Sequence, residues 1–185
     1  IGNLFSIKDE ITLDFRAATI KSANAKALAD NIFTENGTSI LKTIAIYGAN
    51  ASGKSNIIKA IRFCNAMVFE SHKHNENTVY NFQPFKFNGY DNKSSNYFIR
   101  FISAGIEYEY SFSFTRFKIL TESLYYYPKG RITKVFTRDE RTGKTKKEKY
   151  SFGDQIKRPL DVAENTSEKT LYISRASQMD REIAK

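Results

Sequence analysis

The stretch Gly48-Ala49-Asn50-Ala51-Ser52-Gly53-Lys54-Ser55 decides how the rest of this 185-residue chain is interpreted. It fits the pattern G-x-x-x-x-G-K-[ST], the P-loop or Walker A motif, at every specified position. Gly48 and Gly53 permit backbone conformations that a side chain would hinder, so successive N–H groups can turn inward around a phosphate. The sequence therefore predicts a nucleoside triphosphate site, with ATP as the expected ligand.

The segments on either side of this loop favour the same interpretation. Thr43–Tyr47 is a short apolar run rich in β-branched residues, which predicts a buried strand. After the loop, apolar residues recur at helical spacing until about Ser71, at Ile57, Ile58, Ile61, Cys64, Met67 and Val68. The N-terminus of such a helix adds partial positive charge beneath the phosphates. The alternative to a P-loop is a glycine-containing loop that matches the motif by chance. Chance explains poorly why all four specified positions match and why a predicted strand and helix flank the loop.

Each position of the loop has an expected role. Lys54 is the catalytic candidate, because its ammonium group can reach the β- and γ-phosphate oxygens. Ser55 offers a hydroxyl to Mg²⁺. The candidate cofactor-binding residues are Gly48, Ala49, Asn50, Ala51, Ser52, Gly53, Lys54, Ser55 and Asn56. The expected cofactors are ATP and Mg²⁺.

Beyond Pro84 the hydrophobic period changes to two, which predicts an antiparallel β-meander. Its expected strands are Tyr97–Ile102, Ile106–Phe114, Ile119–Tyr127, Arg131–Thr137 and Thr145–Phe152. Elsewhere we expect a strand pair at 4–7 and 11–15, a short helix near Ala23–Asp30, a strand near Ile40 and a last strand at Thr170–Ser174.

Composition narrows the class of protein. The chain is 41% hydrophobic with one cysteine, and no apolar run approaches the roughly 20 residues that span a bilayer, so a cytoplasmic protein is expected. The net charge is +9, and much of the excess lies between Lys129 and Lys149. This basic stretch could contact DNA, or its lysines could simply keep a solvated edge strand from aggregating. The second interpretation is slightly favoured.

The amino-acid sequence of the loop resembles that of a known family. Tyr47–Asn56 is similar to the Walker A motif of ABC-class ATPases of the SMC/RecF/OLD type, closest to prokaryotic AAA ATPases of abortive infection and anti-phage defence. Three other stretches resemble the same family: Ile1–Glu10, Pro84–Phe87 and Thr170–Gln178.

The resemblance implies an α/β fold, namely the N-terminal lobe of an ABC-type P-loop NTPase with a mixed sheet and an adjacent antiparallel meander. One ATP-binding lobe would cover 1–185, with a P-loop core at 1–80, the meander at 81–160, and a strand, Q-loop and the start of a helical arm at 161–185. Gln178 is the implied Q-loop glutamine and second Mg²⁺ contact, with a surface glutamine as the even alternative; Gln83 is the lower-ranked competitor.

The signature motif, the Walker B pair and the switch histidine of such ATPases are not found in the sequence, and His72 and His74 are interpreted as solvated loop residues. A C-terminal lobe would have to supply these motifs, so this chain alone is expected to be incomplete for ATP hydrolysis.

The implied activity is an ATPase in which ATP drives the head-to-head association of two copies. Anti-phage defence, with control of an effector nuclease or toxin, is the favoured role. The alternatives are a DNA-repair or chromosome-maintenance ATPase, for which nucleic acid would be a partner, and a scaffold that senses nucleotide without hydrolysis. No membrane partner is expected.

Overall fold

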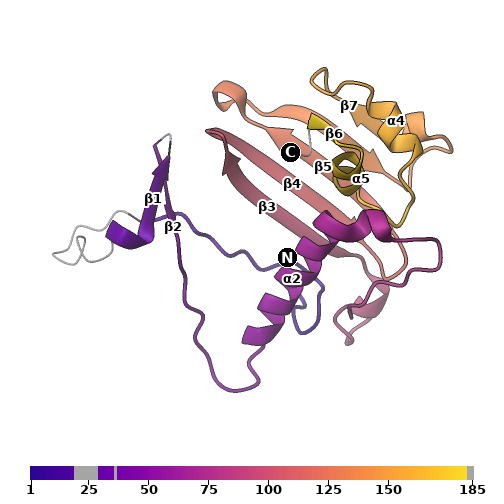
Figure 1. Ribbon diagram of the computed structural model, residues 1–185. Coiled ribbons are helices and arrows are strands. Elements are labelled where there is room, and N and C mark those ends of the chain that lie inside the picture. The colour runs from indigo at the N-terminus through magenta and orange to yellow at the C-terminus, as the bar shows by residue number, and fades with distance from the viewer. Residues whose placement is uncertain (19–28, 36, 183–185) are drawn as a thin grey trace.

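An antiparallel sheet of five strands forms the body of the computed structural model, which describes residues 1–18, 29–35 and 37–182 (Figure 1). Its strands follow one another in space as in sequence: β3 (Ser95–Ser103), β4 (Ile106–Phe114), β5 (Ile119–Tyr126), β6 (Thr133–Asp139) and β7 (Tyr150–Phe152). This arrangement confirms the predicted meander. One detail was wrong, since a short helix, α3 (Lys146–Lys149), replaces the first half of the strand expected from Thr145.

The two faces of the sheet differ because side chains alternate along each strand. One face carries the aromatic residues that fill the core, among them Phe112, Phe114 and Phe136, each at most 2% exposed. The opposite face is lined by hydroxyl groups that pair across strands. Ser111 and Ser123 lie 2.8 Å apart, oxygen to oxygen, and the pair Ser113 and Thr121 lie 2.6 Å apart.

Helix α2 (Lys54–Glu70) lies across the apolar face of the sheet (Figure 1). Its buried residues are Ala60, Cys64 and Met67, and the ring of Phe63 lies 5.5 Å from that of Phe114. The helix ends where the sequence predicted, since Ser71 is its C-cap. Burial raises the pKa of Cys64 to about 12, which fits the packing role expected for it.

The strand predicted at Thr43–Tyr47 does not form. Its residues are exposed or half-exposed, Tyr47 is 91% exposed, and their main-chain groups pair with no strand in the described part of the chain. The reason is that a strand needs a neighbouring strand for its main-chain hydrogen bonds, and no described strand pairs with this run. The mixed sheet expected around it is likewise not formed by the described residues, whose strands pair only antiparallel.

The strand predicted at Thr170–Ser174 was also wrong. This segment enters helix α5 (Tyr172–Gln178), which follows helix α4 (Pro159–Glu164) on the same face of the sheet (Figure 1). A helix forms because the carboxylate of Glu122 accepts hydrogen bonds from the main-chain N–H groups of Tyr172, at 2.6 Å, and Ile173, at 3.1 Å. These are two of the N–H groups that the first turn of a helix leaves unpaired.

The N-terminal region contains bridges in place of the strand pair expected at 4–7 and 11–15. Leu4 pairs with Ile7 and Gly2 with Asn96 as isolated bridges. A separate hairpin of β1 (Ile32–Glu35) and β2 (Thr38–Leu41) confirms the strand near Ile40. The helix expected near Ala23–Asp30 lies largely outside the described residues, and its end belongs to the short 3-10 turn η1 (Ala29–Asn31).

Three more 3-10 turns lie in connections between the larger elements of the described chain: η2 (Ser71–Lys73), η3 (Tyr90–Asn92) and η4 (Pro128–Gly130). None of the helices in the described residues combines the length and apolar character that crossing a membrane requires.

Candidate nucleotide-binding site

The predicted P-loop is an exposed loop that ends at the N-terminus of α2. Gly53 is the residue before the helix, with φ of 93°, a left-handed conformation that favours glycine. Ala51 is also left-handed, with φ of 63°. Two of three successive residues therefore have left-handed backbone conformations, and alternation of this kind lets consecutive N–H groups face one side.

The side chain of Lys54 folds back into this loop. Its Nζ atom donates hydrogen bonds to the carbonyl oxygens of Gly48, at 2.8 Å, and Ala49, at 2.6 Å, and lies 3.5 Å from Oγ of Ser52. Gly48 has little room, since a Cβ there would lie 2.8 Å from the same Ser52 oxygen. The structure thus holds one cationic group at the centre of the predicted loop, where it marks the place for an anion.

The loop and the helix start are open to solvent. Residues 48–52 and Ser55 are exposed. The hydroxyl of Ser55 makes no hydrogen bond to any described residue, so it can become a metal ligand. The first turn of α2, a helix of 17 residues, contributes unpaired N–H groups and the positive end of the helix dipole. These residues fit a triphosphate chemically, because cation, free N–H groups and free hydroxyl meet at one accessible place.

Asn56 and Ser6 form a contact that the sequence did not predict. Asn56 Nδ2 donates a hydrogen bond of 2.8 Å to Ser6 Oγ, from a turn 50 residues away. Asn56 was expected at the nucleotide, whereas Ser6 was interpreted only as part of a strand. The one hint in the sequence was that this first segment resembled the same family as the loop.

The two glutamine candidates lie in different places. Gln178 is exposed and hydrogen-bonds Arg175 on its own helix. That helix is tied to Ser71 and His72, at the opposite end of α2 from Ser55. The structure therefore does not bring Gln178 beside the predicted Mg²⁺ position. Gln83 lies nearer, since its main-chain oxygen accepts the N–H of Phe5, the neighbour of Ser6, at 2.7 Å.

The sequence suggested that the two histidines are solvated loop residues, and the structure shows instead that both contact other segments. Nδ1 of His72 lies 3.1 Å from Oγ of Ser174, and Nδ1 of His74 lies 3.2 Å from the carbonyl oxygen of Lys169. Both join the loop after α2 to the segment before and within α5. Among the described residues, no group of three or more His, Cys, Asp or Glu side chains is arranged to hold a metal ion.

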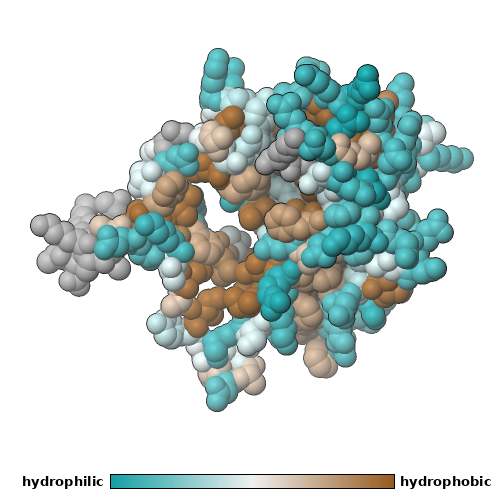
Figure 2. All heavy atoms as spheres, in the orientation of Figure 1, coloured by the Kyte–Doolittle hydropathy of each residue, from teal (hydrophilic) through white to brown (hydrophobic). Residues whose placement is uncertain are grey.

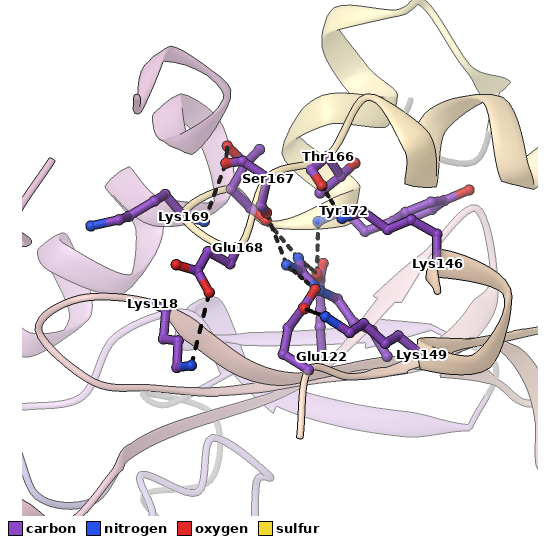
Figure 3. A network of polar contacts seen from close by, with 12 residues as sticks. Lys118, Glu122, Lys146, Lys149, Thr166, Ser167, Glu168, Lys169 and Tyr172 are labelled. Carbon is purple, nitrogen blue, oxygen red and sulfur yellow. Dashed lines mark hydrogen bonds and ion pairs between the residues drawn. The ribbon is translucent and has the colours of Figure 1, made fainter. Parts of the chain in front are cut away.

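A second polar cluster lies on the buried side of the sheet (Figure 3). Figure 3 shows Glu122 and Lys149 beneath the turn that carries Thr166–Tyr172. Arg138, 2% exposed, lies 3.5 Å from Glu122 and 2.7 Å from Glu140, nitrogen to oxygen, and donates to the carbonyl oxygens of Ser167 and Thr170.

Burial raises the pKa of Glu122, although the nearby Arg138 and two main-chain N–H groups act in the opposite direction. A cavity of about 370 Å³ lies beside this cluster, between β5, β6 and β7. The charged groups of the cluster pair with one another and with main-chain groups, so they join β5 and β6 to the segment that leads into α5.

Comparison with known families agrees with the geometry of the loop. Residues 44–184 match a family described as an AAA domain, with a provisional assignment to the AbiEii toxin of type IV toxin–antitoxin systems. No curated protein and no solved structure gives a significant match.

The match includes the P-loop, α2, the meander and α5, and it extends over more than half of the chain. A P-loop ATPase family implies the P-loop NTPase fold, ATP binding and NTPase activity. The resemblance found in the sequence is therefore confirmed, and the chain belongs to this family of AAA/ABC-type P-loop ATPases.

Proposed function

We propose that this chain binds Mg²⁺-ATP through Gly48–Ser55 and forms the nucleotide-binding lobe of an ABC/SMC-like ATPase. The observation that carries the proposal is the Lys54 ammonium group, held inside the loop by the oxygens of Gly48 and Ala49. An incoming phosphate would take this cation from neutral carbonyl groups. A phosphate adds the Coulomb attraction between opposite charges, which a neutral carbonyl oxygen does not supply, so the exchange favours binding.

In the bound state each residue of the loop would have a separate task. Lys54 would neutralise charge on the β- and γ-phosphates, and Ser55 would supply one oxygen ligand to Mg²⁺. The main-chain N–H groups of 49–55 and the start of α2 would surround the β-phosphate. Gln178 would need to move relative to α2 to become a second metal ligand, because α5 is fixed at the far end of that helix.

An exposed apolar surface supports the need for a second lobe. Tyr47 is 91% and Ile58 51% exposed, and Figure 2 shows hydrophobic residues open to solvent beside the N-terminal half of α2. Together with the unpaired run at 43–47, they form an incomplete core. We propose that a second lobe, from this protein or another chain, covers this surface and supplies the groups that polarise water.

The biological role we propose is anti-phage defence, with ATP driving the association of two heads and thereby controlling a nuclease or toxin effector. The family description, which refers to a toxin–antitoxin system, supports this choice. A DNA-repair ATPase is less well supported, because the structure uses most of the basic residues between Lys129 and Lys149 for internal contacts. A nucleotide-sensing scaffold would share the same loop and differ only in lacking turnover.

Binding of a fluorescent ATP analogue to the protein and to Lys54→Ala tests the proposal. Loss of a hydrogen-bonding charge should weaken binding by about ten- to a hundred-fold, since such bonds contribute about 1.5–3 kcal/mol. Lys59→Ala is the matched control, because Lys59 is exposed on the same helix and its substitution removes the same charge.

Equal affinity in Lys54→Ala and Lys59→Ala would exclude the proposed site. Turnover measured in parallel separates the remaining alternatives. Hydrolysis that disappears in Lys54→Ala excludes the scaffold, whereas tight binding with no hydrolysis by the protein and its second lobe together supports it.

A further inference from the structure

The turn Asn3–Ile7 lies directly against the P-loop. Two separate observations place it there. Ser6 Oγ accepts the hydrogen bond from Asn56 at 2.8 Å, and the same oxygen would lie 2.9 Å from a Cβ on Gly53. Ser6 therefore contacts the loop at its last glycine and the helix in its first turn, the two places that orient the N–H groups for a phosphate.

This turn has an unusual backbone. Asn3 and Phe5 both have φ of 54°, a left-handed conformation. Asparagine tolerates that conformation, but for a bulky residue such as phenylalanine it is a true outlier. Strained residues persist only where the surroundings hold them, and they gather at functional sites.

The surroundings hold the turn at both strained residues. The buried amide of Asn3 donates to the carbonyl oxygens of Tyr90 and Lys93, at 2.9 and 3.0 Å, and accepts from the N–H of Phe85 at 2.9 Å. The hydroxyl of Ser95, which is fully buried, donates to the main-chain oxygen of Asn3 at 2.5 Å.

The second strained residue, Phe5, has its own anchor. Its N–H donates to the main-chain oxygen of Gln83 at 2.7 Å, and the flanking residues Leu4 and Ile7 exchange a pair of main-chain hydrogen bonds. A turn fixed on this many sides can keep Ser6 at one position, so it can act as a fixed support for the more exposed loop.

We propose that Asn3–Ile7 is a brace for the P-loop, with Ser6 as its positioning residue. Ser6 keeps Gly53 and the first turn of α2 in the conformation that binds a triphosphate, and Asn56 contributes through Ser6 and not through a contact with the nucleotide. The inference rests on the proposed function. Its physical basis is that binding groups act best when neighbouring packing and hydrogen bonds already fix them.

A double-mutant cycle tests the brace. Dissociation constants for the fluorescent ATP analogue are measured for Ser6→Ala, Asn56→Ala and the double variant. Each single change removes the same hydrogen bond and should weaken binding about five-fold, the equivalent of one net bond. The double variant should also lose only about five-fold, because nothing further remains to be lost.

Two matched variants show whether the hydroxyl itself is responsible. Ser6→Thr retains the hydroxyl and should bind more tightly than Ser6→Ala. Ser94→Ala removes an exposed serine hydroxyl close to the same turn, where it makes no side-chain hydrogen bond to any described residue, and should bind as the wild type does.

Additive losses, about 25-fold in the double variant by the same reckoning, would show that Asn56 contacts the nucleotide independently and would overturn the inference. Unchanged affinity in Ser6→Ala would do the same. Failure of the proposed function is distinguishable, because then Lys54→Ala would bind as well as the wild type. In that case the same cycle on the unfolding midpoint decides whether Ser6 and Asn56 support one another.

Discussion

The P-loop region and the buried cluster around Arg138 place their charged groups in opposite surroundings. Arg138 is 2% exposed and bonds two carboxylates and two carbonyl oxygens, all within the protein. In the P-loop region the ammonium of Lys54 bonds, among the residues that the structure describes, to oxygens of its own loop. The preceding run ends in Tyr47, which is 91% exposed.

The contrast shows where the chain is stable and where it can bind. In the buried cluster Arg138, Glu122 and Glu140 are paired with one another, and removing one leaves another stranded. In the P-loop the partners are few, local and replaceable. A ligand of opposite charge can therefore enter the second region without disturbing the first.

The largest effect is expected from Arg138→Met. It leaves Glu122 and Glu140 buried without their shared cation, so the free energy of unfolding should fall by about 3–5 kcal/mol. Urea unfolding measures this change. Arg141→Met is the control, because Arg141 forms the same kind of pair with Asp139 at the exposed surface and should change stability little.

A loss in Arg138→Met as small as that of an exposed ion pair, about 1 kcal/mol or less, would remove the contrast between the two regions. Substituting both members, as in Glu122→Gln with Arg138→Met, should cost less than Arg138→Met alone, since the stranded carboxylate is gone.

An intermediate effect is expected from Gly53→Ala, measured as affinity for the ATP analogue. The substitution forces alanine into φ of 93° and places its Cβ 2.9 Å from Ser6. A left-handed residue with a side chain costs about 1–2 kcal/mol, and the displaced loop should lose at least about ten-fold in affinity.

Gly37→Ala is the control that separates the effect of backbone strain from the effect of a side chain placed beside the P-loop. Gly37 has φ of 78°, but a Cβ there meets nothing within 4 Å. This variant should show the cost of strain in stability with unchanged nucleotide affinity. Equal affinities in the two variants would mean that the conformation at Gly53 is unrelated to binding.

The smallest effect is expected from neutralising exposed lysines in the basic stretch. Five of its nine cations form a hydrogen bond or an ion pair with another residue of the same chain: Lys134, Arg138, Arg141, Lys146 and Lys149. The exposed remainder lies at the two ends of β6, which are about 23 Å apart at about 3.3 Å per residue. Lys144→Ala with Lys147→Ala should therefore leave duplex DNA affinity and its salt dependence nearly unchanged.

If these two lysines each contacted a phosphate, the double variant would lose both contacts. Its plot of log affinity against log salt concentration would then be less steep than that of the wild type, by about 1.8. A change of that size would restore the DNA-repair hypothesis. Lys146 is left unaltered in this test because its Nζ atom donates a hydrogen bond to the carbonyl oxygen of Thr166.

The sequence predicted best what depends on local pattern. The alternation from Ile106 to Phe114 and the helical spacing after Lys54 each produced the expected element. The sequence-based prediction failed where contacts with residues distant in the sequence determine the secondary structure. The run at 43–47 has the composition of a buried strand but no neighbour in the described chain, and the segment at Thr170 becomes helical because a carboxylate from another strand caps it.

The candidate site shows the same division. The residue types and spacing of the loop predict Gly53, Lys54 and Ser55 as binding groups, and the family match extends over these residues. Ser6 could not be found in this way, because its role depends on a contact across 50 residues. The position of Gln178 depends equally on long-range packing, and its metal role stays a prediction.

Hydrogen–deuterium exchange with and without Mg²⁺-ATP tests the location of the site most directly. At a Mg²⁺-ATP concentration close to the wild-type dissociation constant, we predict slower exchange of the main-chain N–H groups in residues 48–56 and no change across the hydroxyl-lined strands β4 and β5. At the same concentration, Lys54→Ala should lose most of this protection, because it binds more weakly. Protection elsewhere with none in residues 48–56, or the same protection in Lys54→Ala, would contradict the account.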